Sequence, residues 1–292
     1  MTRKQHYIPR FYLERFTDSS RKLWIYDASR DIVFEKSPEG ACVRTDLYET
    51  EWIEANEKLG KYVLPNDIED LYSRYEAEFS AFLRELDHIL IRDQLLNASI
   101  CSAKNRRLMF RFIANLLFRN PKTMEEYKLS EVDTGILGED GTNELCEILD
   151  KMGIGGGRSI LKAVKKKEVL TEEYDGGEIS EFIKSMEKLP FIFLYAMSGN
   201  FVLCDPPVTT GYDVNIDGDN RDCIFCPLSP KTVVLFGNYQ GFKKNKMYKI
   251  EKDIVDRFNY IYIGKRDKTA KMIICNNEIQ RAEIMEKLRR RD

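Results

Sequence analysis

Residues 66–90 read NDIEDLYSRYEAEFSAFLRELDHIL, and this stretch decides the class of fold. Its apolar residues recur every three or four positions, the spacing that places side chains on one face of an α-helix. Asn66 is a good N-cap residue, and Glu69 follows it at the distance of a capping box. The stretch predicts a long amphipathic helix whose apolar face consists of Ile68, Leu71, Tyr72, Tyr75, Phe79, Phe82, Leu83, Leu86, Ile89 and Leu90.

Helical spacing continues towards the C-terminus. The next helix begins near Ser102, and Asn120-Pro121 should end it, because the residue before a proline disfavours helical backbone. Gly153 is expected to end the following helix, which is predicted at residues 143–152. The helices predicted beyond residue 90 cover 102–117, 143–152, 159–167, 179–189, 250–264 and 278–291.

The N-terminal 60 residues form a different pattern. Residues 8–16 have helical spacing, and Pro9 suits the first turn of that helix, where a backbone N–H has no partner. Two apolar runs, 22–26 and 31–35, flank the polar residues 27–30, which predicts a β-hairpin with a four-residue loop. Residues 46–50 are predicted to add a short edge strand.

The C-terminal third contains short apolar runs bounded by Gly, Asn, Asp and Pro, the pattern of strands buried on both faces. We therefore predict an α+β fold in which a helix-rich middle packs on a mixed sheet built from C-terminal strands and the N-terminal hairpin. The chain is interpreted as a single domain, 1–292, with regions 1–60 (helix plus hairpin), 61–190 (helical) and 191–292 (strand-rich, with C-terminal helices). The predicted C-terminal strands are 191–196, 201–204, 223–226, 232–236 and 272–275.

Composition limits the cellular setting. The 292 residues carry 46 Lys+Arg and 48 Asp+Glu, so the formal net charge is −2, and 43% of residues are hydrophobic, as in a globular protein. No run approaches the roughly 18 apolar residues of a membrane span, and the first residues lack the apolar core of a signal peptide. Seven scattered cysteines do not make a disulfide framework. A cytoplasmic protein with no membrane partner is expected.

Two polar residues are candidates for chemistry. His6 precedes the first predicted helix and has Arg3, Lys4 and Arg10 nearby, so it is well placed to meet an anion at a helix N-terminus. A ring that caps the helix or bonds a carbonyl is the alternative. Asp205 ends the run 201–204 and precedes two prolines, which suits a carboxylate at the mouth of a strand or a turn-forming residue.

Three other motifs indicate ordinary structure rather than a site. Residues 213–219 copy the first half of a calcium loop, but Ile224 stands where the bidentate Glu belongs. Cys223 and Cys226 form a single C-x-x-C, which is better explained by buried thiols than by a zinc site. The glycines of 153–159 lack the ending of a phosphate loop, and no nucleotide cofactor motif occurs.

Basic residues gather in four clusters despite the near-neutral total. Such clusters can bind a phosphate backbone through one concentrated face, or they can be solvated helix surfaces. Nucleic acid is therefore one expected partner, and a protein partner is another. The clusters are Arg106, Arg107 and Arg111; Lys162 with Lys165, Lys166 and Lys167; Lys243, Lys244 and Lys246; and Arg289, Arg290 and Arg291.

Several segments, taken together and in order, resemble the family labelled domain of unknown function 4238. The opening Gln5-His6-Tyr7-Ile8-Pro9 resembles its Gln-His-Tyr-x-Pro start, and Arg119-Asn120-Pro121 resembles its Arg-x-Pro helix end. The segment 201–208 resembles Phe-x-x-Ser-Asp-x-Pro-Val, with Cys204 in place of the hydroxyl residue, and 227–230 reads Pro-Leu-Ser-Pro. The resemblance implies no settled activity, but it raises the weight on His6, Arg119 and Asp205.

These three residues suit chemistry on a phosphate ester. The expected function is a phosphodiester hydrolase, a metal-dependent nuclease of bacterial defence, in which His6 is general base or metal ligand, Asp205 is metal ligand or acid, and Arg119 holds the phosphate. The metal would be Mg²⁺ or Mn²⁺, with His6 and Asp205 as ligands. The alternative is a non-catalytic binding or regulatory module, whose motifs lock the fold and whose basic faces dock a protein or nucleic acid. A third possibility, a small-molecule enzyme, requires a cavity near Asp205.

Overall fold

The computed structural model describes residues 4–53, 60–92, 102–131, 138–153, 156–187, 189–210, 224–237, 246–264 and 272–289. Within these ranges the fold is α+β, as the sequence predicts. The motif at 213–219, Cys223 and the glycine at 155 lie outside the described residues.

The N-terminal unit begins with a short strand, β1 (Lys4–His6), followed by α1 (Arg10–Leu13) and the 3₁₀ turn η1 (Glu14–Phe16). The predicted hairpin is confirmed: β2 (Leu23–Asp27) and β3 (Ile32–Lys36) pair in antiparallel register, with Ile25 opposite Phe34. The 3₁₀ turn η2 (Pro38–Gly40) leads to β4 (Val43–Thr45), which pairs with β1. The predicted strand at 46–50 is wrong, because Asp46 has a φ of 53°, a left-handed conformation that ends extended backbone.

The helical middle follows the predicted order. The helix predicted at residues 66–90 is α2, and the described side chains of its apolar face lie in the core or pack against it. The Oγ of Ser102 caps α3 by accepting the N–H of Asn105. Asn120-Pro121 does more than end α3, because Asn120 caps a new helix, α4, and Pro121 occupies its first turn. The helices are α2 (Asp67–Arg92), α3 (Ala103–Phe118), α4 (Pro121–Glu126), α5 (Gly138–Lys151), α6 (Gly157–Leu170) and α7 (Glu178–Met186).

Within the described ranges, β1 and β4 form a two-stranded sheet, and the other strands form two four-stranded sheets. One sheet has the order β3-β2-β10-β6 and is antiparallel, so the N-terminal hairpin joins strands from the far end of the chain. The other has the order β7-β8-β5-β9 and is mixed, because β5 runs antiparallel to β8 and parallel to β9. The C-terminal elements are β5 (Phe191–Ala196), β6 (Leu203–Cys204), β7 (Ile224–Ser229), β8 (Thr232–Phe236), β9 (Lys246–Ile250), α8 (Lys252–Gly264), β10 (Met272–Cys275) and α9 (Glu278–Arg289).

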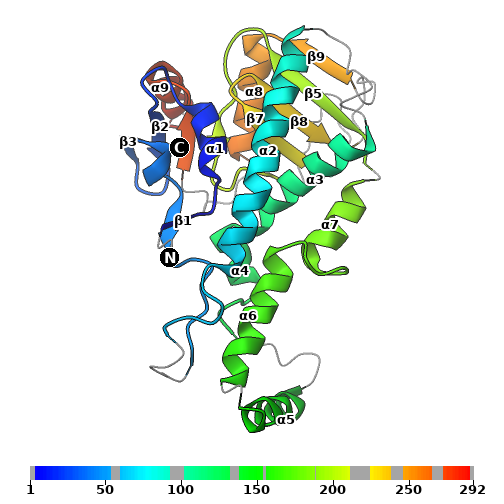
Figure 1. Ribbon diagram of the computed structural model, residues 1–292. Helices are drawn as coiled ribbons and strands as arrows, with labels where there is room; N and C mark the ends of the chain where they lie inside the picture. Colours follow the sequence, from blue (N-terminus) through cyan, green and yellow to red (C-terminus); the bar gives the residue numbers. More distant parts are fainter. Residues whose placement is uncertain are drawn as a thin grey trace.

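Figure 1 shows how these elements are arranged. The sheet that contains β2 and β3 lies at the upper left beside α9, the sheet that contains β5 and β8 lies at the upper right, and α6 and α5 extend to the bottom. Aromatic side chains fill the space between the N-terminal unit and the helices. The ring of Phe112 on α3 lies 5.3 Å from the ring of Tyr12 on α1 and 5.3 Å from that of Phe79 on α2. These contacts join α1, α2 and α3 into one core.

None of the described helices combines the length and apolarity that a membrane crossing requires. The cysteines within the described ranges are buried free thiols, namely Cys42, Cys146, Cys204, Cys226 and Cys275. Burial raises the pKa of Cys226 to about 12, so this thiol stays protonated at neutral pH.

Candidate functional site

His6 lies at the end of β1 and is half-buried. Its Nε2 lies 3.0 Å from the carbonyl oxygen of Pro38, so Nε2 carries the proton and donates it. Burial lowers the pKa of the His6 imidazole, and the nearby charge of Arg119 acts in the same direction. The ring is therefore neutral at pH 7, and Nδ1 is its remaining acceptor. The carbonyl contact is the alternative that the sequence left open for this residue.

Arg119 lies at the C-terminal end of α3 and is 2% exposed. One terminal nitrogen donates to Glu76 Oε1 at 2.9 Å, the other donates to the backbone carbonyl of His6, and Nε donates to the hydroxyl of Tyr48 at 3.4 Å. The guanidinium also lies over the ring of Tyr72, 4.3 Å from its centroid. These contacts give Arg119 a role inside the fold, where it fixes β1 against α2 and α3.

Asp205 follows β6 and is half-buried. Its Oδ2 accepts the hydroxyl of Tyr7 at 3.1 Å, and its Oδ1 accepts Asn120 Nδ2 at 3.2 Å. Burial and the neighbouring Asp205 raise the pKa of Tyr7, so the phenol keeps the proton that it donates. The carboxylate thus holds together segments that lie 198 residues apart in the chain.

We call Gln5, His6, Tyr7, Arg119, Asn120 and Asp205 the motif cluster. The structure brings the three predicted site residues together in this cluster. The guanidinium of Arg119 donates to the backbone carbonyl of His6. The carboxylate of Asp205 is held by Tyr7 and Asn120, which follow His6 and Arg119 in the chain. No group of three His, Cys, Asp or Glu side chains suited to a metal occurs within the described ranges. Nε2 of His6 donates to a carbonyl, which leaves Nδ1 as the ring atom that can accept a proton or bind a ligand.

Two residues of the motif cluster adjoin the lining of a groove, Gln5 through a hydrogen bond to Glu49 and Asn120 as the residue before Pro121. Gln5 donates from Nε2 to Glu49 Oε1 at 2.8 Å and accepts the N–H of Tyr48 through Oε1 at 2.7 Å. Glu49 and Pro121 both line the groove. The cluster therefore positions two walls of the groove, the segment after β4 and the start of α4.

The groove has a volume of about 530 Å³, within the range of small-molecule sites. Lys166 of α6 lines it and is 7% exposed. Its Nζ donates to the carbonyl oxygen of Glu49 at 2.6 Å. The lining side chains are Arg44, Thr45, Asp46, Leu47, Glu49, Thr50, Glu51, Tyr62, Pro121, Met124, Glu125, Leu129, Ser130, Lys162 and Lys166.

Charges in the groove are unevenly satisfied. Asp46 accepts the hydroxyl of Tyr62 at 2.7 Å, and Glu51 pairs with Lys61 at 3.0 Å. By contrast, Arg44 and Lys162 form no ion pair with any residue in the described ranges. The groove therefore holds cations that are available to a ligand, whereas two of its carboxylates already have partners.

In two of the other basic clusters, described arginines are paired within the protein. Arg111 donates from Nε to Glu172 at 2.6 Å, and Arg289 donates to Asp31 at 3.0 Å. Arg290 and Arg291 lie outside the described residues, as do Lys243 and Lys244. The sequence grouped Lys162 and Lys166 with their neighbours as one cluster, and no signal in it marked Arg44.

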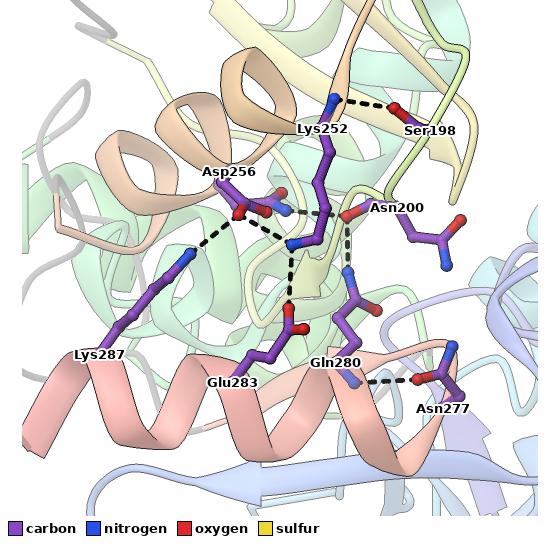
Figure 2. Close-up of polar contacts among 9 residues, drawn as sticks. Ser198, Asn200, Lys252, Asp256, Asn277, Gln280, Glu283 and Lys287 are labelled. Carbon is purple, nitrogen blue, oxygen red and sulfur yellow. Dashed lines mark hydrogen bonds and ion pairs between the residues drawn. The ribbon is translucent and has the colours of Figure 1, made fainter.

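A second polar cluster lies between α8 and α9 (Figure 2). Lys252 Nζ donates to Asp256 Oδ2 at 2.9 Å and to Glu283 Oε2 at 3.0 Å, while Lys287 Nζ donates to the same Asp256 oxygen at 2.9 Å. The crevice beside these residues has a volume of only about 20 Å³, little more than a water molecule needs. This cluster fastens α9 to α8 and offers no room for a ligand.

Glu69 makes stability depend on pH. Burial raises its pKa to about 7, and its Oε2 is buried with no hydrogen-bond partner in the described structure. The folded state binds a proton more tightly than the unfolded state between pH 4.5 and 7, so ionisation of Glu69 lowers stability as pH rises through that window. We expect Glu69→Gln to remove this loss. The free energy of unfolding of the variant, measured with urea, should therefore rise relative to that of wild type between pH 5 and pH 8. The exposed Glu85→Gln is the control, and an equal pH dependence in wild type and Glu69→Gln would contradict the assignment.

Comparison with known proteins places most of the chain in one family profile. The profile, described as "Protein of unknown function (DUF4238)", matches residues 4–277. No curated protein and no solved structure matches the chain. The matched residues include the whole motif cluster and every residue that lines the groove.

Proposed function

We propose, from the premise that this chain belongs to the DUF4238 family of proteins of unknown function, that it binds a phosphate ester of nucleotide size in the groove between β4, α4 and α6. The observation that carries the proposal is the set of cations on the groove. Arg44 and Lys162 have no carboxylate partner in the described ranges, and Lys166 stands beside them. A phosphate group is the anion that such a set of donors recognises well.

The lining favours a small ligand over a long nucleic acid. Carboxylates of Asp46, Glu51 and Glu125 lie on the same groove and would repel a continuous phosphate backbone. Apolar side chains of Leu47 and Met124 offer contact area to an uncharged body. One phosphate on an apolar or aromatic body therefore suits both halves of the lining.

A phosphodiester hydrolase at the motif cluster is the second candidate. The observation that favours it is the meeting of the predicted residues His6, Arg119 and Asp205 in one cluster. In this candidate Nδ1 of the neutral His6 ring takes a proton from water, and Asp205 orients the water or the leaving group. The nuclease assignment and its biological setting in defence belong to this candidate.

Titration calorimetry at pH 7 tests the first candidate, with inorganic phosphate and adenosine monophosphate as probes and adenosine as the phosphate-free control. Lys162→Met and Lys166→Met are each expected to weaken the binding of adenosine monophosphate about 10- to 50-fold, because each variant loses one charge-assisted contact. Lys151→Met on α5, whose side chain is 76% exposed, is the matched control and should change nothing. No heat with either phosphate probe, or equal affinity in wild type and both groove variants, would contradict the proposal.

The same preparations separate the two candidates. Labelled single- and double-stranded DNA and RNA are incubated with Mg²⁺, Mn²⁺ or EDTA, together with an Asp205→Asn variant checked for folding. Cleavage that Asp205→Asn abolishes and Lys166→Met leaves intact would support the hydrolase at the motif cluster. Binding lost in Lys166→Met without any cleavage would support the groove alone.

A further inference from the structure

Two neighbouring lysines of α6 have opposite surroundings. Lys167 pairs with Asp67 at 2.9 Å and with Glu173 at 3.0 Å, and the hydrogen bond to Asp67 raises its pKa. Lys166 contacts a neutral acceptor instead, the backbone carbonyl of Glu49, and forms no ion pair within the described ranges. One residue along the helix therefore separates a solvated, paired ammonium from a buried, unpaired one.

The buried amine of Lys166 loses its proton easily. Burial lowers its pKa to about 8, and the like charge of Lys162 adds to this, while Glu49 acts in the opposite direction. The other charged and titratable groups on the groove are Arg44, Asp46, Glu51, Tyr62 and Glu125. About a tenth of Lys166 is then uncharged at pH 7, whereas an ordinary lysine is almost entirely protonated.

We propose that Lys166 is a nucleophile that forms an imine with the carbonyl carbon of an aldehyde or ketone held in the groove. The site combines a buried amine, open space beside it and neighbouring cations, which is the environment that activates lysine in carbonyl chemistry. This inference rests on the proposed function, because Lys162 and Arg44 would hold an anionic group on the same ligand. Lys166 is the reacting residue, and the two cations position the carbonyl.

The chemistry balances without a further reactant. The nitrogen lone pair forms the N–C bond, and the carbonyl π electrons move to oxygen. The carbinolamine then loses that oxygen as water, which takes both protons of the neutral amine with it. The product is a C=N bond between Nζ and the former carbonyl carbon, and it accepts one proton when it becomes an iminium.

Borohydride trapping tests the inference on the full chain. Pyridoxal 5′-phosphate is the phosphate-bearing aldehyde probe, pyridoxal is its phosphate-free counterpart, and peptide mass spectrometry locates the reduced adduct. We expect Lys166 to be labelled first, at least tenfold faster than Lys165 and Lys167 on the same helix. Its labelling rate should rise about tenfold between pH 7 and pH 9 and then level off, as expected for a pKa near 8.

The two probes distinguish failure of this inference from failure of the proposed function. Lys162→Met should slow labelling by pyridoxal 5′-phosphate about tenfold more than it slows labelling by pyridoxal, because the loss of the Lys162 charge raises the pKa of Lys166 and so affects both probes alike. If Lys162→Met affects labelling by the two probes equally, and Lys166 is still labelled first, then the groove does not bind the phosphate but Lys166 is still a nucleophile. If phosphate binds but Lys166 is labelled no faster than Lys165, then the nucleophilic role of Lys166 is contradicted, whereas phosphate binding in the groove is supported. Lys166→Arg, which retains a cation, should abolish the selective adduct.

Discussion

Replacing Arg119 by Met is expected to lower the free energy of unfolding by about 3–5 kcal/mol, as loss of one partner from a buried charged network does. The variant removes the donors that Glu76, Tyr48 and the carbonyl of His6 share. Met fills much of the volume, so the loss reports the polar contacts rather than a cavity. Urea unfolding followed by circular dichroism measures it.

Arg107 provides the matched control for Arg119. It lies on the same helix, its side chain is 67% exposed, and it pairs with Glu187 only at 3.9 Å. Arg107→Met should change stability by less than about 0.5 kcal/mol. A loss below about 1 kcal/mol in Arg119→Met would mean that the network does not hold β1 in place.

Phe112→Ala is expected to cost about 3–5 kcal/mol as well, by a different mechanism. Phe112 is fully buried on α3 and touches the rings of Phe11, Tyr12 and Phe79. Truncation removes apolar contacts and leaves a cavity where three elements meet, which cannot close without moving α1 or α2. The expected loss is again measured by urea unfolding.

A half-exposed side chain on α5 is the control for this truncation. Ile148 is 46% exposed, so Ile148→Ala should cost less than about 1 kcal/mol. A loss below about 1.5 kcal/mol for Phe112→Ala would show that α1 and the helices pack independently of this ring.

Local patterns predicted most of the elements because period and turn residues are properties of short segments. The apolar stripe of α2 and the hairpin of β2 and β3 depend on neighbours within a few residues. β9 was missed because it is an edge strand with two lysines and mostly partial burial, so it lacks the apolar run of a central strand. The sequence predicts that a helix stops at Pro121, although proline also suits the first turn of a helix, and both roles apply here.

The site was less predictable, because it depends on packing between distant segments. The motifs directed attention to His6, Arg119 and Asp205, and the structure does gather them, but largely through contacts within the protein. Nothing in the run of lysines at 165–167 separates Lys166 from its neighbours. Its burial comes from the segment after β4, which packs on α6 from more than a hundred residues away.

The interpretation of residues 1–292 as a single domain stays a prediction.

The contact between Tyr7 and Asp205 also constrains the order of events during synthesis. The 198 residues from Ile8 to Asp205 take roughly 10–40 s to translate at 5–20 residues per second. Until Asp205 leaves the ribosome, the aromatic segment around Tyr7 and Tyr12 lacks its final partners, and β2 lacks β10. The N-terminal unit therefore spends much of translation as an incomplete, partly apolar surface.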